Sequence, residues 1–188
     1  MDKPQDQTDE ALIAGLTAGR PAALDELFRR HYADLCRIAN RFVRDEAQAE
    51  DIIQELFVSL WEKRATLPEL ESVGPYLRRS ARNRSLNFLR DSKRIPVTDA
   101  EVPERTAAPA VVGNLEGAEL RARITRAIDQ LPERCRLVFT MSKLEDMSHR
   151  DIARSLDIST KTVENQMTRA YRYLREWLAL LVLLNAPF

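Results

Sequence analysis

Hydrophobic residues in the first half of the chain recur at helical spacing, every three, four or seven positions. Such intervals place side chains on one face of a helix with 3.6 residues per turn. The first such stripe contains Leu24, Leu27, Phe28, Leu35, Ile38 and Phe42. The second contains Ile52, Ile53, Leu56, Phe57, Leu60 and Trp61, followed by the cations Lys63 and Arg64, which suit the carbonyl end of a helix.

Two further helices complete the predicted first domain. One begins near Gly74-Pro75, because proline is tolerated in a first turn, and its apolar positions are Tyr76, Leu77, Ala81, Leu86 and Leu89. The other is short, is opened by Thr8, and has its apolar positions at Leu12, Ile13 and Leu16. No alternating strand pattern interrupts them. The first half therefore predicts an all-helical bundle.

The second half predicts a helix-turn-helix. Two apolar helices come first, at 120–131 and 137–144, separated by Pro132. Ser148-His149-Arg150-Asp151 then has the S-x-x-D form of a capping box, and it opens a short helix that ends at the turn Asp157-Ile158. Ser159 caps the next helix. Its predicted inward face consists of Val163, Met167, Ala170, Tyr171, Leu174 and Leu178.

A break in the helical pattern separates the two halves. Prolines and acidic residues gather between residues 95 and 117, and this composition cannot bury enough apolar surface to offset its ordering entropy. The sequence therefore predicts an all-α protein in which two small helical domains are joined by a flexible acidic linker. The predicted boundaries are a first domain at 1–94, the linker at 95–117, a second domain at 118–176 and an apolar tail at 177–188.

Composition excludes several classes of function. Few glycines are present, and neither a G-x-x-x-x-G-K-[ST] nor a G-x-G-x-x-G run occurs, which disfavours nucleotide-binding loops. Cys36, Cys135, His31 and His149 form no ligand pattern, so we expect no metal and no organic cofactor. The polar, acidic N-terminus has no apolar signal segment, and the unpaired cysteines fit a reducing compartment, so a cytoplasmic location is expected.

Charge is segregated although the formal net charge is zero, with 29 Lys and Arg against 29 Asp and Glu. One run is strongly basic, and asparagines and Phe88 lie among its cations: Arg78, Arg79, Arg82, Arg84, Arg90, Lys93 and Arg94. Such a run predicts a surface for a polyanion, and the amides and the aromatic ring favour single-stranded nucleic acid. The alternative is an arginine-rich surface helix paired with neighbouring acids.

Two polar faces carry further candidate chemistry. The second helix of the helix-turn-helix presents amides, hydroxyls and guanidinium groups that suit base edges and phosphates in duplex DNA: Thr160, Lys161, Asn165, Thr168, Arg169 and Arg172. Asp51, Gln54 and Glu55 share the face opposite the second apolar stripe. For both faces the alternative is a solvated helix surface.

Taken in order, these features resemble the extracytoplasmic-function (group IV) sigma factors, the smallest class of bacterial RNA polymerase sigma subunits. The segments that carry the resemblance are DELFRRHY, AEDIIQELFVSLW, PYLRRSARNRSLNFLR, LPERCRLVFTMSKLEDMSHRDIARSLDIST and KTVENQMTRAYRYLRE. The resemblance implies a sigma region-2 bundle followed by a region-4 helix-turn-helix. It also implies an alternative sigma factor that binds core RNA polymerase and directs promoter recognition and DNA melting.

The resemblance assigns roles by position. Residues Asp51, Gln54 and Glu55 would bind core polymerase. The minus-ten element, with its single-stranded segment, would be bound by Arg78, Arg79, Arg82, Asn83, Arg84, Ser85, Asn87, Arg90, Lys93 and Arg94. The duplex minus-thirty-five element would be bound by Thr160, Lys161, Thr162, Asn165, Gln166, Arg169 and Arg172.

Other readings stay open at this point. The apolar tail is too short to span a bilayer, which needs about 20 apolar residues, so no stable membrane insertion is expected. A packing surface or a surface for a partner, such as an anti-sigma factor, is expected instead. A polymerase-independent helix-turn-helix regulator is the main alternative function. A helical scaffold is a further one. No nucleophile, base and orienting group are brought together by the pattern, so no enzyme is predicted.

Overall fold

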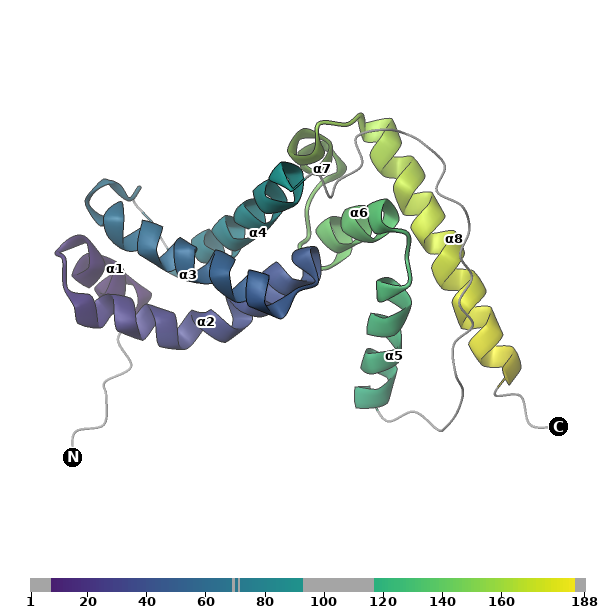
Figure 1. Cartoon of the computed structure of the whole chain (residues 1–188), viewed down its shortest axis with the longest axis horizontal. Coiled ribbons are helices and arrows are strands. Elements are labelled where there is room, and N and C mark those ends of the chain that lie inside the picture. The colour runs from purple at the N-terminus through teal and green to yellow at the C-terminus, as the bar shows by residue number, and fades with distance from the viewer. Residues whose placement is uncertain (1–7, 69, 71, 93–116, 185–188) are drawn as a thin grey trace. The chain divides into compact units, whose positions relative to one another are not determined.

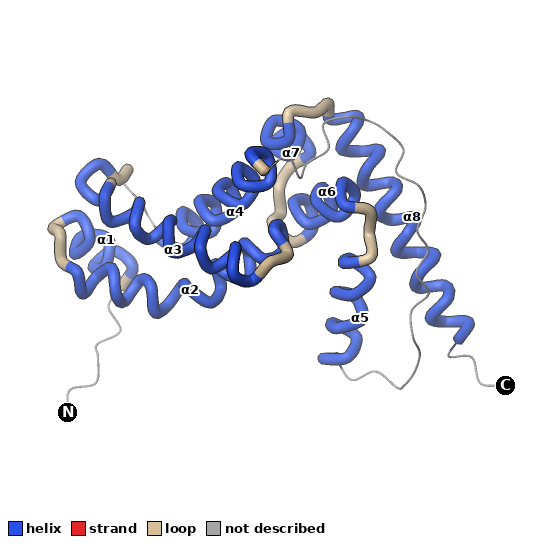
Figure 2. The backbone as a smooth tube through the Cα atoms, in the orientation of Figure 1, coloured by secondary structure: helices blue, strands red, loops and turns tan. Residues whose placement is uncertain are grey.

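The structure, a computed structural model, describes residues 8–68, 70, 72–92 and 117–184. Within these residues the regular elements are eight α-helices and one short 3-10 helix, with no strand (Figure 2). The predicted all-α fold is therefore confirmed. The chain divides into two compact units, Met1–Ile95 and Pro96–Phe188. Apart from Gly117, the predicted linker lies outside the described residues.

The N-terminal unit consists of α1 (Asp9–Thr17), α2 (Pro21–Val43), α3 (Glu46–Glu62), the 3-10 helix η1 (Arg64–Thr66) and α4 (Val73–Asp91). Helix α2 contacts each of α1, α3 and α4 (Figure 1). The predicted apolar stripes supply the core, whose largest fully buried side chains here are Leu12, Leu16, Leu27, Leu35, Phe42, Ile53, Val73 and Leu77. Burial of these stripes, more than helix propensity, holds the bundle together.

Local chemistry sets the helix ends in this unit. The Thr8 side chain accepts a hydrogen bond from the Ala11 amide, as the sequence predicted, and Asp45 caps α3 through the Gln48 amide. Arg44 ends α2 in the left-handed region, with φ of 56°. Gly15 is buried where α1 meets α2, and a Cβ there would lie 2.9 Å from the Cβ of Ala23. Glycine thus permits this close approach of the two helices.

The C-terminal unit consists of α5 (Gly117–Asp129), α6 (Glu133–Lys143), α7 (His149–Leu156) and α8 (Thr160–Leu184). Helix α8 contacts the other three, most extensively α6 and α7. The largest fully buried side chains here are those of Val138, Met141, Ile152 and Val163. The unit's own core therefore fixes α8 against α6 and α7.

The structure corrects one expectation about the second half. Tyr171 was expected on the inward face of its helix, but its side chain is 44% exposed, and its ring forms a T-shaped pair with that of Phe139 at a centroid distance of 6.0 Å. Helix α8 runs past the predicted tail boundary at residue 176 and continues to Leu184. A run of leucine, valine and alanine without glycine or proline gives the helix no reason to stop earlier. Residues 185–188 lie outside the described residues.

No helix among the described residues combines the length and the apolar character needed to cross a bilayer.

Candidate nucleic-acid and protein interfaces

Capping side chains build the helix-turn-helix of the C-terminal unit. The Ser148 hydroxyl accepts from the Asp151 amide at 3.2 Å and donates to the Asp151 carboxylate at 2.6 Å. The Asp151 carboxylate therefore accepts from the Ser148 hydroxyl. In the predicted capping box it would instead accept from a backbone amide. Asp157 forms the turn in the left-handed region, with φ of 53°. Ser159 then starts α8 by accepting from the Thr162 amide at 2.9 Å.

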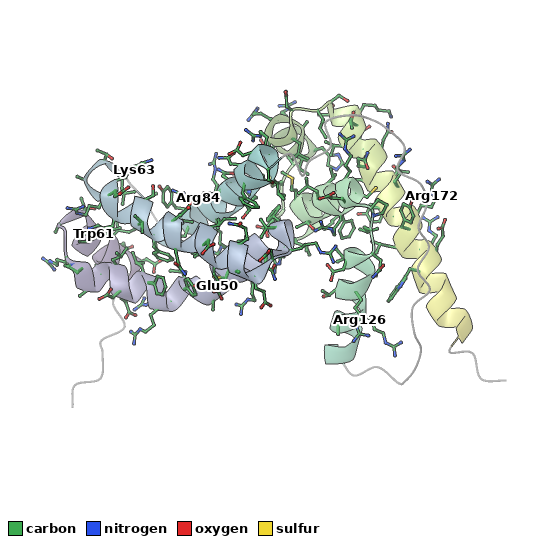
Figure 3. The ribbon with its side chains drawn as sticks, in the orientation of Figure 1. Glu50, Trp61, Lys63, Arg84, Arg126 and Arg172 are labelled. Atoms are coloured by element: carbon green, nitrogen blue, oxygen red, sulfur yellow. The ribbon has the colours of Figure 1, made fainter. Side chains whose placement is uncertain are left out.

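The outer face of α8 is polar and open. Its exposed members include the predicted Thr160, Lys161, Asn165, Thr168, Arg169 and Arg172, while Thr162 is half-buried. Figure 3 shows Arg172 on this helix. Lys161 lies 3.5 Å from Glu164, and since both side chains are exposed, this pair contributes little stability and can be exchanged for a phosphate contact. The face therefore supplies donors for base edges and cations for the backbone.

Gln166 does not lie on that outer face, and the prediction that placed it there is corrected. Its side chain is only 7% exposed, and its Oε1 accepts a hydrogen bond from the Cys135 Sγ at 3.0 Å. The residue falls within the buried stripe of α8, between Val163 and Ala170. A buried amide needs such a partner, because leaving it unpaired costs free energy.

Helix α4 carries the basic run. Arg79, Asn83, Asn87 and Arg90 are all exposed, and their spacing of three or four residues places them on one face. Arg78 is also exposed, but its guanidinium lies 3.8 Å from the Asp34 carboxylate of α2. Arg82 and Arg84 are half-buried flanks of the face. The remaining predicted members, Lys93 and Arg94, lie outside the described residues.

The prediction that Ser85 reads a base is likewise corrected. The Ser85 side chain is fully buried, and its hydroxyl donates to the Ala81 carbonyl at 2.9 Å. A short hydroxyl on the inner side of a helix satisfies itself by bonding one turn back. Ser85 therefore belongs to the packing of α4 against the bundle.

Helix α3 is the acidic counterpart of α4. It contains five acidic residues and no lysine or arginine: Glu46, Glu50, Asp51, Glu55 and Glu62. The predicted Asp51, Gln54 and Glu55 are all exposed, so the structure brings them to one surface. The Gln54 side chain is hydrogen-bonded to Tyr32 of α2.

The outer face of α3 also contains a residue that the sequence reasoning missed. Val58 lies one turn after Gln54 and is 58% exposed. It stands at i+3 and i+4 from Glu55 and Gln54, so the same spacing argument that grouped those two residues would have included it. It was overlooked because neighbouring apolar residues of α3 belong to the core.

No group of three or more His, Cys, Asp or Glu side chains within the described residues is arranged to hold a metal ion. Cys36 and Cys135 are free thiols, and burial raises the pKa of each.

Comparison with known proteins identifies both units. Residues 27–95 match the family model of sigma-70 region 2, and residues 121–174 match that of sigma-70 region 4. The chain belongs to the extracytoplasmic-function sigma factors. It is 29% identical over 169 residues to the ECF RNA polymerase sigma factor SigM of Mycobacterium tuberculosis, which covers 88% of this chain and 82% of that relative. It is 28% identical over 174 residues to the RNA polymerase sigma-H factor of Pseudomonas aeruginosa, covering 87% and 90%.

A solved structure supports the fold of this sigma factor. The structure of CnrH in complex with the cytosolic domain of CnrY aligns with a TM-score of 0.51 and 24% identity, covering 91% of this chain and 97% of that one. The region-2 match contains α3 and α4, and the region-4 match contains α7 and the first part of α8, up to residue 174. The ECF sigma factor accordingly acts as an alternative sigma factor in transcription initiation.

Proposed function

We propose that this ECF sigma factor docks on core RNA polymerase through α3, binds the minus-ten element through α4 and reads the minus-thirty-five element through α8. It does this in the cytoplasm and acts by binding, with no reaction of its own. The predicted domain limits at 94, 117 and 176 remain part of this proposal. The roles of individual residues follow from the surfaces on which they lie.

The separation of charge within the N-terminal unit carries the proposal. The charged residues of α3 are all acidic, whereas those of α4 are five arginines and one acid, Asp91. Figure 3 labels one member of each set, Glu50 on α3 and Arg84 on α4. An acidic helix repels DNA and suits a basic protein surface, while the basic helix attracts the phosphate backbone. One small bundle is thereby suited to contact protein and DNA at once.

The exposed face of α4 fits a single strand. Arg79 and Arg90 are placed one at each end of Asn83 and Asn87, so cations for phosphates bracket amides that can pair with the edge of an unstacked base. Unpairing and flipping a base costs a few kcal/mol. Amides that bind the base once it is out stabilise the open promoter, and the contacts of α8 with the duplex add to the binding energy that opening requires.

The major-groove role of α8 rests on its exposed side chains. Asn165 and Arg169 offer two-point contacts to base edges, and Lys161 and Arg172 offer cations to the backbone. Gln166 is left out of this proposal because it is buried, and Ser85 is left out of the minus-ten set for the same reason.

An anti-sigma factor remains a proposed partner of this chain. The sequence favoured a packing or partner surface at the apolar tail, whose side chains from Leu178 onward lie outside the described residues. Its binding would be detected as inhibition of transcription by a protein that coelutes with the full chain.

Run-off transcription with purified bacterial core polymerase and a promoter library tests the proposal. Defined transcripts that appear only when the ECF sigma factor is added are the expected result. A polymerase-independent regulator would instead bind a two-fold symmetric DNA site by itself and would start no transcripts.

Replacing Asn83 tests the assignment of α4. Asn83→Ala should lower the permanganate reactivity of the minus-ten region about tenfold, with little change in duplex binding, because one amide contact to a flipped base is lost. Thr125→Ala, an exposed change on α5, is the matched control. Equal reactivity of wild type and Asn83→Ala would remove Asn83 from the site.

A further inference from the structure

The open face of α8 contains a single acid among its cations. The cations of residues 160–175 are Lys161, Arg169, Arg172 and Arg175. Glu164 is the one acidic residue of that stretch, and its side chain is exposed on the same face, three residues after Lys161 and four before Thr168. Phosphates repel a carboxylate, so an acid at this place weakens DNA binding unless it accepts a hydrogen bond from the DNA.

Helix stability does not account for Glu164. Its carboxylate lies 3.5 Å from the Lys161 ammonium, but the two side chains are 53% and 77% exposed, and an exposed pair of this kind contributes little free energy. The helix dipole favours acids in the first turn, whereas Glu164 lies in the second turn of α8. The carboxylate is therefore available to a partner outside the chain.

Neighbouring hydroxyls are already hydrogen-bonded within the chain. Thr168 donates to the Glu164 carbonyl at 2.9 Å, and the Thr162 hydroxyl is bonded to that of Ser159 at 2.9 Å. The first turns of α8, which contacts α7 (Figure 1), are the part of such a helix that reaches base edges. Because an ionised acceptor forms stronger hydrogen bonds than a neutral one, the Glu164 carboxylate is the strongest acceptor that this part of the helix offers to a base.

We infer that Glu164 determines specificity within the minus-thirty-five element by accepting a hydrogen bond from the N4 amino group of a cytosine. This inference rests on the proposed function of α8 and adds a residue to its reading face. In the major groove guanine presents the acceptors N7 and O6 and thymine presents O4, so both repel a carboxylate. Adenine places the acceptor N7 beside its N6 amino group, whereas cytosine presents its N4 donor without an acceptor of its own. A carboxylate therefore selects cytosine.

Lys161 makes this contact compatible with the nearby phosphates. When its ammonium binds the DNA backbone, the Glu164 carboxylate loses its partner within the chain and is free to bind the base. The ammonium remains one turn away, so it offsets part of the repulsion between Glu164 and the phosphates. At sequences without the cytosine that repulsion is uncompensated, and Glu164 therefore adds more to discrimination than to affinity.

Selection from a promoter library with a randomised minus-thirty-five region tests the inference, with holoenzyme assembled from the full chain and purified core polymerase. The wild type should select cytosine at the position that Glu164 reads. Glu164→Ala should reduce that preference about tenfold and leave the other positions unchanged. Glu164→Gln should shift the position to adenine, whose N6 and N7 pair with an amide. Glu176→Gln removes an acid from an exposed position later in α8 and should select as the wild type does.

The pattern of base preferences decides the outcome. Unchanged preferences in Glu164→Ala, or selection of another base at the position that this variant relaxes, would overturn the inference. A uniform rise in affinity for all sequences would also overturn it, because Glu164 would then act through the phosphates alone.

Two controls separate this inference from the proposed function and from misfolding. If Glu164→Ala selects as the wild type does while Asn165→Ala changes base preference, the inference fails and the major-groove role of α8 stands. Unchanged preferences in both variants would remove that role too. Thermal unfolding checks that Glu164→Ala is folded at the assay temperature; if it is not, the nearly isosteric Glu164→Gln decides, and its failure to shift the preference to adenine would overturn the inference.

Discussion

The histidine at position 31 lies half-buried in α2, with its Nε2 enclosed and without a hydrogen-bond partner. Burial lowers its pKa from the ordinary value of 6.5; Arg78 and Arg30 lower it further, while Asp9 and Asp34 act in the opposite direction. The unfolded chain therefore takes up a proton at a higher pH than the folded one does. Stability contributed by neutral His31 is complete above pH 6.5 and is lost as the pH falls through the folded-state pKa.

Urea unfolding at pH 7.5 and pH 5.5 measures this effect. The chain has two tryptophans, and Trp177→Phe leaves Trp61 of α3 as a reporter of the N-terminal unit. In that background the parent protein should lose more unfolding free energy on acidification than the His31→Gln variant, which has no titrating ring. Equal losses in the two proteins would show that other groups govern the acid sensitivity.

Gln166 and Asn165 are neighbours with opposite expected effects. Gln166→Ala removes the partner of the buried Cys135 thiol and should lower the stability of the C-terminal unit by about 1–2 kcal/mol, without altering which base pairs are preferred. Asn165→Ala, on the exposed face, should change base preference and leave stability within about 0.5 kcal/mol. Thermal unfolding and binding to a set of minus-thirty-five variants separate the two. A changed base preference for Gln166→Ala would return that residue to the interface.

For single residues, the sequence predicted well which helix carries each candidate side chain. It predicted less well which of these side chains are exposed. Helical spacing places Asn83, Asn165 and Asp51 outside correctly. Ser85 and Gln166 are polar, and residue type alone gave no sign that they sit in the buried stripe. The Ser85 hydroxyl bonds to a carbonyl one turn back in its own helix. The Gln166 amide bonds to a cysteine 31 residues away, which is a tertiary contact. A partner that is distant in sequence, such as Cys135 for Gln166, can be found only from the fold.

Among the helices, α8 depends on its first turn for its position in the helix-turn-helix. Ser159→Ala removes the side chain that accepts from the Thr162 amide, and an N-cap of this kind contributes about 1 kcal/mol. Amide hydrogen exchange in the first turn of α8 should accelerate about fivefold, with smaller changes in α6. Ser159→Asp, another capping residue, should restore protection. If it does not, the loss in Ser159→Ala has a cause other than capping.

Three helix starts were predictable because a capping residue marks each of them. Thr8, Ser148 and Ser159 all accept the predicted backbone bonds. The edges of the apolar stripes were harder, since a helical face grades from buried to exposed. Phe28 and Tyr171 both satisfy the period, yet each lies at an edge where no neighbouring helix covers it fully.

For the whole molecule, the informative property is the distribution of its charge. A net charge of zero gives no sign of DNA binding, and the acids of α3 and the arginines of α4 cancel in any total. The positions of the charges along the chain show the difference, because the acids gather on α3 and five arginines gather on α4. The fold then places both helices in one unit, against the common support of α2. Composition could not have predicted this shared support.

Two double variants should therefore separate the two activities of the chain. Arg79→Ala with Arg90→Ala should preserve binding to core polymerase but reduce the salt slope of open-promoter binding by about 1.4, since each lost contact to a single strand contributes about 0.7. Asp51→Ala with Glu55→Ala should weaken core binding about tenfold or more and leave that slope unchanged once enough variant is added to fill the polymerase. Filter retention of promoter DNA between 50 and 200 mM salt, about the range in which such slopes are measured, provides the comparison. Should both variants alter core affinity equally, charge segregation between α3 and α4 would not divide protein binding from DNA binding.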